Sequence, residues 1–295
     1  MELVPARQIV TRTGKPGGFY GYDYNMNLYR GCCHGCIYCD SRSDCYRVEN
    51  FDQVRGKKDA LEIVARELRS KHRTGVVSTG AMSDPYNPFE EEYELTRGRL
   101  ELIDRYGFGI SVLTQSPLVA RDAGLYQRIS HHSLVSAKMT VTTADDELSK
   151  IIEPHVAPSS VRFGAIRALS DAGLFTGIAV VPVLPFLTDS DENIRGLVEL
   201  AAASGARYVY LETGVTLRMN QQQYFYNALD KHFPGLKEEY VRGFGSLYRC
   251  ITPRHREVRR TLADHCKRNG LLYRLNDILA AQREPYQQPQ LSLFL

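Results

Sequence analysis

Three cysteines within eight residues constrain most strongly what this chain can fold into. Cys32, Cys36 and Cys39 follow a C-x3-C-x2-C spacing, and the aromatic residue Tyr38 directly precedes the last of them. Thiolates so close in sequence can bind three irons of one iron–sulfur cube, whereas a cluster with four cysteine ligands is an electron carrier. A fourth, open iron can bind a substrate and pass it an electron. The spacing therefore predicts a [4Fe-4S] cluster with one open iron.

Other uses of these cysteines fit the sequence less well. A ferredoxin-type run starting at Cys33 would need a further cysteine at the position of Ser43. A structural zinc site usually has two separated ligand pairs, and the chain has no second CxxC pair. A disulfide framework does not suit an odd number of cysteines, seven, in a chain of 295 residues.

The composition allows one large core, or a barrel with an extension. The chain is 43% hydrophobic and carries a net charge of +3. Its longest apolar stretch, residues 178–187, is interrupted by Pro182 and Pro185 and is too short to span a membrane. The N-terminus has no basic region followed by an apolar one, so no signal peptide is expected. These features predict a cytoplasmic protein without a membrane partner.

Short apolar strands alternate with amphipathic helices along most of the chain. The strands are expected at residues 25–29, 75–79, 109–114, 134–141, 175–181 and 208–212. The helices are expected at residues 60–70, 93–106, 118–129, 159–172 and 191–203. Such alternation implies parallel strands with helical crossovers, and six units fit an α/β partial (β/α)6 barrel. Chemistry gathers at the carboxyl ends of the strands in such folds, and the first strand delivers the cysteine loop there.

We expect four regions in the chain. Residues 1–23 are predicted to be an irregular N-terminal lead-in, and residues 24–214 form the barrel. Residues 215–286 are predicted to be a helical, basic C-terminal extension that covers the open side of the barrel. Residues 287–295 form a tail.

The cysteine motif resembles the signature of the radical S-adenosylmethionine (SAM) superfamily, C-x3-C-x-aromatic-C. Residues 27–32 and 84–88 resemble the branch related to spore photoproduct lyase. Residues 36–46 resemble the radical SAM mobile pair proteins of mobile genetic elements, the B member in particular. The resemblance, over roughly residues 20–214, implies a radical SAM barrel with SAM on the open iron.

The resemblance also implies a chemistry and two partners. A reduced cluster would cleave SAM to methionine and a 5′-deoxyadenosyl radical that abstracts hydrogen, while the protein positions and shields the reactants. An external electron donor would reduce the cluster. A second radical SAM protein would be the partner implied by the mobile pair.

Cofactor-binding roles are implied for residues near the strand ends. Tyr38 is expected near the adenine or packed beside the cluster. Thr79 and Gly80 follow the second strand, where the family holds the SAM ammonium with backbone groups. Lys138 and Thr140 share one face of the fourth strand, and Lys138 is expected to meet the SAM carboxylate unless that face is solvated.

Arg162 has two interpretations. It resembles a recurring feature of the branch and would bind the SAM carboxylate by paired hydrogen bonds. The alternative is a surface ion pair with Glu153. Glu212 ends the sixth strand and points to the same rim.

No catalytic residue can be assigned from the sequence. Spore photoproduct lyase uses a cysteine before the middle of its barrel as a hydrogen-atom donor. This chain has no cysteine between Cys45 and Cys250, so the role cannot be transferred. Cys250 and Cys266 are expected to be buried structural thiols.

Two features indicate nucleic acid. The basic segment 249–268, with Tyr240, Phe244 and Tyr248 nearby, is suited to bind phosphates and stack on bases of DNA or RNA, or it is a solvated helix face. The segment Gln290–Phe294 resembles the peptide with which bacterial DNA enzymes bind the replication sliding clamp, or it folds onto its own protein.

The leading hypothesis is a radical SAM enzyme that acts on nucleic acid or a nucleic-acid-associated substrate. One alternative is a radical SAM enzyme that modifies peptides or proteins. The other is an iron–sulfur nucleic-acid-binding protein without catalysis.

Overall fold

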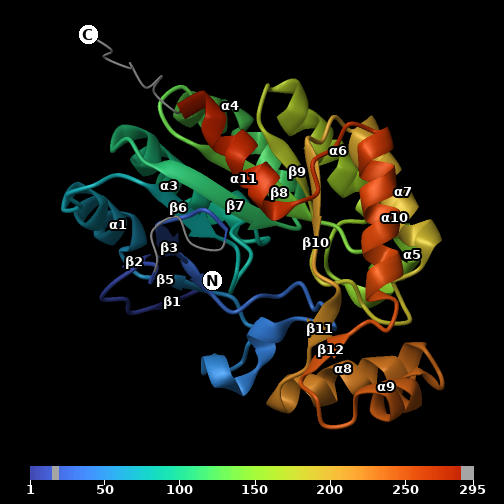
Figure 1. The fold of residues 1–295 in the computed structure, drawn as a ribbon. Helices are drawn as coiled ribbons and strands as arrows, with labels where there is room; N and C mark the ends of the chain where they lie inside the picture. The colour runs from blue at the N-terminus through green and yellow to red at the C-terminus, as the bar shows by residue number, and fades with distance from the viewer. Residues whose placement is uncertain (15–19, 287–295) are drawn as a thin grey trace.

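A seven-stranded sheet forms the centre of the computed structural model, which describes residues 1–14 and 20–286 (Figure 1). Its strand order is β10-β9-β8-β7-β6-β3-β2, and all pairs are parallel except β2 with β3. The strands are β2 (Val10–Arg12), β3 (Tyr24–Met26), β6 (Val76–Thr79), β7 (Gly109–Thr114), β8 (Val135–Thr140), β9 (Thr176–Val180) and β10 (Tyr208–Leu211). The six parallel strands follow one another in chain order, so the predicted six-unit open barrel is confirmed.

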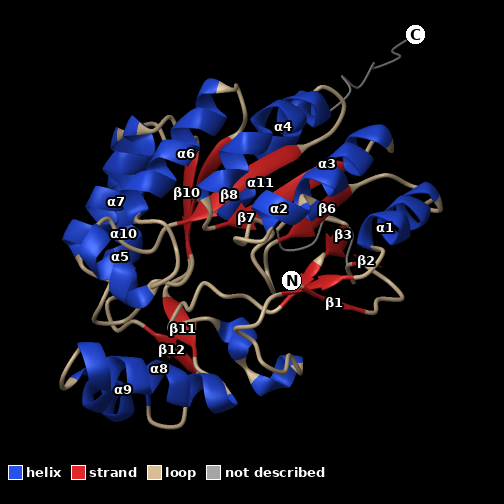
Figure 2. Ribbon diagram, turned by 180° about the vertical axis from the view of Figure 1, so that it is seen from behind, coloured by secondary structure: helices blue, strands red, loops and turns tan. Residues whose placement is uncertain are grey.

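Helices between the strands cover the outer face of this sheet, as the view from behind shows (Figure 2). They are α1 (Ala60–Arg69), α2 (Glu90–Tyr93), α3 (Leu95–Arg105), α4 (Ala123–Ser130), α5 (Asp146–Ile152), α6 (Ser159–Asp171) and α7 (Asp191–Ala203). Side-chain caps mark the starts of α5 and α7. Ser190 accepts a hydrogen bond from the Asn193 backbone N–H, and two acidic residues follow in the first turn of α7. The expected helix at 118–129 begins as the 3₁₀-helix η3 (Pro117–Asp122).

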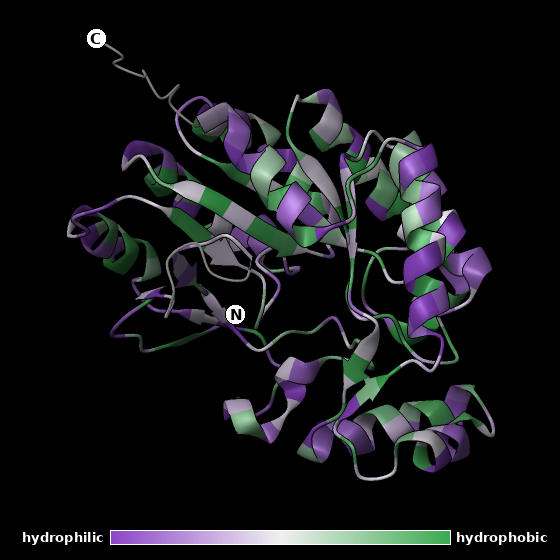
Figure 3. Ribbon diagram, in the orientation of Figure 1, coloured by the Kyte–Doolittle hydropathy of each residue, from purple (hydrophilic) through white to green (hydrophobic). Residues whose placement is uncertain are grey.

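The central strands β7, β8 and β9 are buried on both faces, as expected for a parallel sheet between two layers. All five residues of β9 are buried, and apolar residues concentrate in the central strands (Figure 3). The second layer is α11 (Leu275–Arg283), which crosses the inner face of the sheet (Figure 1). This helix belongs to the predicted C-terminal extension and covers part of the inner face of the sheet.

The N-terminal residues are not irregular throughout, so that prediction was wrong. β1 (Glu2–Val4) joins β5 (Arg55–Lys57) and β4 (Tyr29–Arg30) in a small sheet, and β2 extends the central sheet. Strands of three residues are too short to show a period-two pattern. Their pairing partners also lie far away in the chain, which sequence patterns cannot reveal.

The C-terminal extension divides into parts with different neighbours. β11 (Gly214–Thr216) pairs with β12 (Arg249–Ile251), and α8 (Met219–His232) and α9 (Leu236–Phe244) lie between them in sequence. Their apolar side chains form one buried cluster with Ile37 and Tyr38 of the cysteine loop. α10 (His255–Arg268) packs against α7, and the 3₁₀-helix η4 (Glu284–Tyr286) follows α11.

Two further predictions concern the clamp-like tail and membrane-spanning segments. The clamp-like segment Gln290–Phe294 lies outside the described residues. Among the described residues, no helix is both long and apolar enough to cross a membrane.

Candidate cofactor-binding site

A cavity of about 500 Å³ lies at the carboxyl ends of the barrel strands and contains the three motif cysteines. Its walls come from the cysteine loop, from the ends of β6 to β10 and from the antiparallel strand pair β11 and β12. Its lining residues include Cys32, Cys36, Tyr38, Cys39, Gly80, Asp84, Gln115, Thr140, Glu212, Thr213, Arg218, Tyr248 and Arg249. The three cysteines therefore lie at the carboxyl ends of the strands, where the strand-end rule predicts them.

The cysteine loop is fixed by backbone contacts on both sides. The Cys32 N–H donates to the Phe51 carbonyl at 2.8 Å, and the Ile37 N–H donates to the Ile152 carbonyl at 2.9 Å. Gly31 has φ +80°, and a Cβ there would lie 2.6 Å from the carbonyl oxygens of Phe51 and Gln53. The loop can therefore take this path only with glycine before the first cysteine.

The three thiols lie close enough to influence one another electrostatically. Burial, followed by the neighbouring Cys32, raises the pKa of Cys39 to about 11. The pKa of buried Cys36 is also raised, first by burial, then by Glu153 and by the other two cysteines. All seven cysteines are free, and Cys33 does not line the cavity. Metal binding would therefore have to displace protons from these thiols.

The donor set fits a cluster better than a single ion. Within residues 1–14 and 20–286, no three His, Cys, Asp or Glu side chains are arranged to hold one metal ion. Thiolates that bind different irons of one cube need not converge on a point. Three thiols on one wall of a cavity, without a fourth cysteine among its described lining residues, are the arrangement that an open iron requires.

A fully buried hydrogen-bond network lies directly behind Cys36. The Cys36 thiol donates to Gln115 Oε1 at 3.1 Å, and Gln115 Nε2 donates to the Tyr38 hydroxyl at 2.8 Å. Tyr38 donates in turn to Glu153, which forms an ion pair with Arg162. Tyr38 thus lines the cavity while its hydroxyl is hydrogen-bonded to Gln115 and Glu153.

Arg162 does not reach the cavity. Its side chain is 0% exposed, and besides Glu153 it donates to the Thr140 carbonyl at 2.8 Å and to Ser149 Oγ at 2.6 Å. The expected contact with the SAM carboxylate does not fit this position. The ion pair with Glu153 is present, but it is buried rather than on the surface.

Asp84 connects three segments of the site. Its carboxylate accepts hydrogen bonds from Thr114 Oγ1 at 2.6 Å and from the Gln115 N–H at 2.7 Å. It also lies 3.6 Å from Nδ1 of His34 in the cysteine loop. Burial opposes protonation of His34, but Asp84 and Cys32 outweigh it and raise the pKa of His34 to about 9. The loop is thereby anchored to the ends of β6 and β7.

Thr79 and Gly80 have different surroundings. Gly80 lines the cavity with φ +101°, and a Cβ there would lie 1.9 Å from the Leu113 carbonyl oxygen. Only glycine fits, and it leaves backbone groups facing the cavity. The Thr79 side chain instead accepts a hydrogen bond from Arg99 Nη1 at 2.8 Å and is buried away from the cysteines.

The predicted alternation along β8 is present, but it separates Lys138 from Thr140. Thr140 lines the cavity with the cysteines. Lys138 lies one step deeper on the same face, donates to Ser111 Oγ at 2.7 Å and lines a second cavity under α11. The predicted contact between Lys138 and the SAM carboxylate does not fit this position.

Several lining residues were missed by the sequence analysis. Gln115 follows β7 as Glu212 follows β10, so the strand-end rule could have found it. Arg218, Tyr248 and Arg249 reach the cavity from the paired strands β11 and β12 and the residues beside them, and no sequence pattern predicts this long-range pairing.

The three aromatic residues that were predicted to stack on bases differ in exposure. Tyr248 is 57% exposed at the mouth of the cavity, whereas Tyr240 and Phe244 are buried in the core. The last two are therefore not available to stack on bases.

Comparison with known proteins matches this arrangement. The radical SAM superfamily model matches residues 26–200. An uncharacterised protein of Mycobacterium tuberculosis is 32% identical over 249 residues, which cover 81% of this chain and 72% of that protein. The radical SAM Nalpha-GlyT isomerase of Pseudomonas phage M6 is 25% identical over 182 residues, 61% of this chain and 37% of that protein.

Solved structures agree on the fold. Spore photoproduct lyase complexed with dinucleoside spore photoproduct superposes with a TM-score of 0.65 at 15% identity, over 92% of this chain and 81% of that one. Family model, relatives, barrel and cysteine cavity all lead to the same assignment: the chain belongs to the radical SAM superfamily.

Proposed function

We propose that this protein is a radical SAM enzyme that acts on nucleic acid. The observation that carries the proposal is the position of the cysteine cavity. It shares the lining residues Glu212 and Arg249 with an arginine-lined groove, so a cofactor at the cysteines would lie beside a surface suited to a polyanion.

Cys32, Cys36 and Cys39 would hold a [4Fe-4S] cluster, and SAM would lie beside it in the cavity. Bound together, the two cofactors supply a 5′-deoxyadenosyl radical that abstracts hydrogen. Gly80 offers backbone groups toward the SAM ammonium, while Thr140 offers a hydroxyl. The side chains of Glu212 and Thr213 offer further acceptors in the same cavity.

The groove beside this cavity has a volume of about 790 Å³ and is lined by Arg249, Arg259 and Arg274. These arginines come from β12, α10 and the segment before α11, and none forms an ion pair within the described chain. Glu212 and Asp277 also line the groove, so its three guanidinium groups outnumber its two carboxylates. The Glu212 carboxylate accepts a hydrogen bond from the Tyr210 hydroxyl. Arginine guanidinium groups bind phosphates by paired hydrogen bonds, so three of them suit a phosphate backbone.

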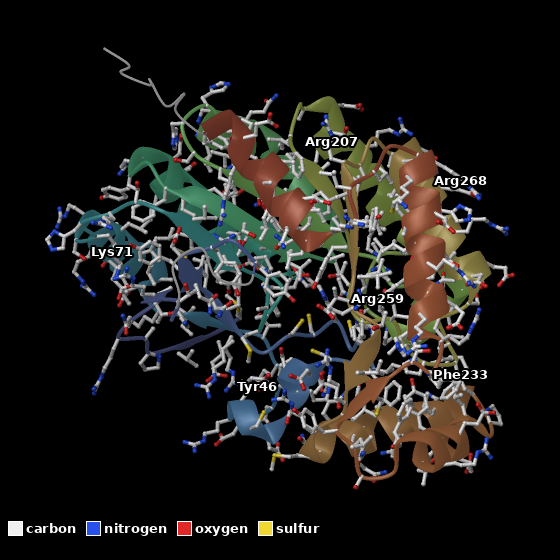
Figure 4. The ribbon with its side chains drawn as sticks, in the orientation of Figure 1. Tyr46, Lys71, Arg207, Phe233, Arg259 and Arg268 are labelled. Carbon is white, nitrogen blue, oxygen red and sulfur yellow. The ribbon has the colours of Figure 1, made fainter. Side chains whose placement is uncertain are left out.

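The basic residues of α10 do not form one continuous surface. Arg259 lies on the side of α10 toward β10, whereas Arg268 lies at the far end of the helix (Figure 4). Arg254 is already engaged with Asp191 at 3.0 Å. We therefore assign phosphate binding to the three groove arginines rather than to the whole segment 249–268.

Related proteins support this choice of substrate. One neighbour in fold, spore photoproduct lyase, was solved with a dinucleoside photoproduct. Seven free cysteines fit a reducing compartment such as the cytoplasm. The tail segment Gln290–Phe294 would recruit the enzyme to the sliding clamp, and an external electron donor and a second radical SAM protein would complete its partners.

The test is SAM cleavage by the anaerobically reconstituted protein with a chemical reductant, measured as 5′-deoxyadenosine. We expect formation of this product, and a faster rate when a single-stranded oligonucleotide is added. A protein that assembles its cluster but never cleaves SAM would refute the proposal and favour the non-catalytic alternative. Cleavage accelerated by a peptide but not by DNA or RNA would favour a peptide-modifying enzyme.

A further inference from the structure

A second cavity lies deeper in the barrel, between the inner face of the sheet and α11. Its volume of about 270 Å³ is near the lower end of the ~300–1,000 Å³ typical of small-molecule sites. It shares Ala81, Leu113 and Val181 with the cysteine cavity. The two cavities therefore adjoin at these residues, and a group in the deeper one would lie beside the cysteine cavity.

The floor of this cavity contains a lysine without a carboxylate partner. Lys138 is half-buried, donates to Ser111 Oγ at 2.7 Å and lies 3.3 Å from Ser136 Oγ. No Asp or Glu forms an ion pair with it within the described chain, and burial lowers its pKa to about 8. An ammonium has three donors, so one remains available to an acceptor inside the cavity.

The walls suit a flat ring. Tyr20, Tyr22 and Tyr210 line the cavity, and the Tyr20 ring meets Tyr210 edge-on with 6.0 Å between ring centroids. Leu275, Ile278 and Leu279 of α11 provide an apolar lid, together with Gln282. Aromatic and aliphatic walls with one charged donor at the floor bind rings that carry a hydrogen-bond acceptor.

The cavity also borders the arginine groove. Tyr210 and Leu275 line both hollows, and Glu212 and Arg249 line both the groove and the cysteine cavity. All three hollows thus meet around the carboxyl end of β10. A nucleic-acid strand that bound its phosphates in the groove would bring one of its bases next to the deeper cavity.

We propose that the cavity under α11 binds a single unstacked nucleobase, and that Lys138 selects bases with a carbonyl oxygen by donating a hydrogen bond to it. The proposal rests on the proposed action on nucleic acid and adds where the base lies and what recognises it. Lys138 is then a specificity-determining residue. A lysine that serves only the fold would leave base preference unchanged.

The experiment compares binding of two fluorescent octamers, dT8 and dA8, to the cluster-loaded protein by anisotropy. Thymine carries two carbonyl oxygens and adenine carries none. We expect the wild type to bind dT8 about tenfold more tightly, as one hydrogen bond to a charged donor implies. Lys138→Met should reduce this ratio to about one, whereas Arg259→Gln should weaken both octamers equally.

Two further variants make the test specific. Lys150→Met, which removes an exposed lysine of α5 that pairs with Glu147, should change neither affinity nor ratio. Leu279→Trp should fill the cavity from α11 and remove the preference without touching Lys138. An unchanged ratio in Lys138→Met, or equal binding of both octamers by the wild type, would overturn the base pocket alone. Failure of the wild type to bind either octamer would overturn the action on nucleic acid as well.

Discussion

Replacing Arg162 with Met should destabilise the protein by about 3 kcal/mol and leave SAM affinity nearly unchanged in the protein that remains folded. Arg162 and Glu153 are both 0% exposed, and Arg162 also donates to the Thr140 carbonyl and to Ser149. Removing one member of a buried ion pair costs about 3–5 kcal/mol, because the other charge stays buried without its partner.

The surroundings of Glu153 place the cost at the lower end of that range. After the substitution its carboxylate would still accept hydrogen bonds from Tyr38, from Thr142 Oγ1 at 3.0 Å and from Gln115 Nε2 at 3.2 Å. The double variant Glu153→Gln/Arg162→Met removes both charges. It should therefore recover more than about 1 kcal/mol relative to Arg162→Met.

The assay is urea unfolding of the cluster-free protein under reducing conditions, followed by circular dichroism. SAM affinity is measured separately on the reconstituted protein. A loss of less than about 1 kcal/mol, or a double variant as unstable as the single one, would refute the network argument. Normal stability with weakened SAM binding would restore the role that the sequence suggested for Arg162.

Four other changes have defined outcomes. Alanine at Cys32, Cys36 or Cys39 should abolish the cluster absorbance, whereas Cys33→Ala should preserve it. Lys138→Met should raise the unfolding free energy at pH 7 by about 1–3 kcal/mol, since it removes a buried charge. This gain should disappear between pH 8 and 10.5, where the folded wild type has released the proton and the unfolded chain still binds it. Arg259→Gln, but not Arg268→Gln, should lower the salt dependence of oligonucleotide binding by about one in slope. Deleting residues 290–295 should eliminate clamp binding in calorimetry without changing SAM cleavage.

Much of the barrel is predictable because its signals are local. The periodicity of apolar residues and the positions of turn residues located all six parallel strands. The strand-end rule predicted that the cysteines, Gly80 and Glu212 lie near one another, and they line one cavity. The same rule would have found Gln115. The location of each of these residues follows mainly from which strand it ends or follows.

Depth inside the barrel was not predictable. Alternation along β8 correctly put Lys138 and Thr140 on one face, but it cannot tell which level of the barrel each one reaches. Arg162 looked like a ligand residue because the sequence does not show that Glu153 is buried beside it.

Long-range pairing was the other barrier. β12 pairs with β11 across two helices, and this pairing alone brings Arg249 to the cavity.

Deuterium transfer tests the central claim most directly. The reconstituted enzyme is incubated with SAM, a reductant and a single-stranded oligonucleotide whose nucleotides are fully deuterated. Mass spectrometry then follows 5′-deoxyadenosine. We expect deuterium in this product with the wild type and no product with Cys36→Ala. Abundant 5′-deoxyadenosine without deuterium, from both deuterated DNA and deuterated RNA, would contradict it.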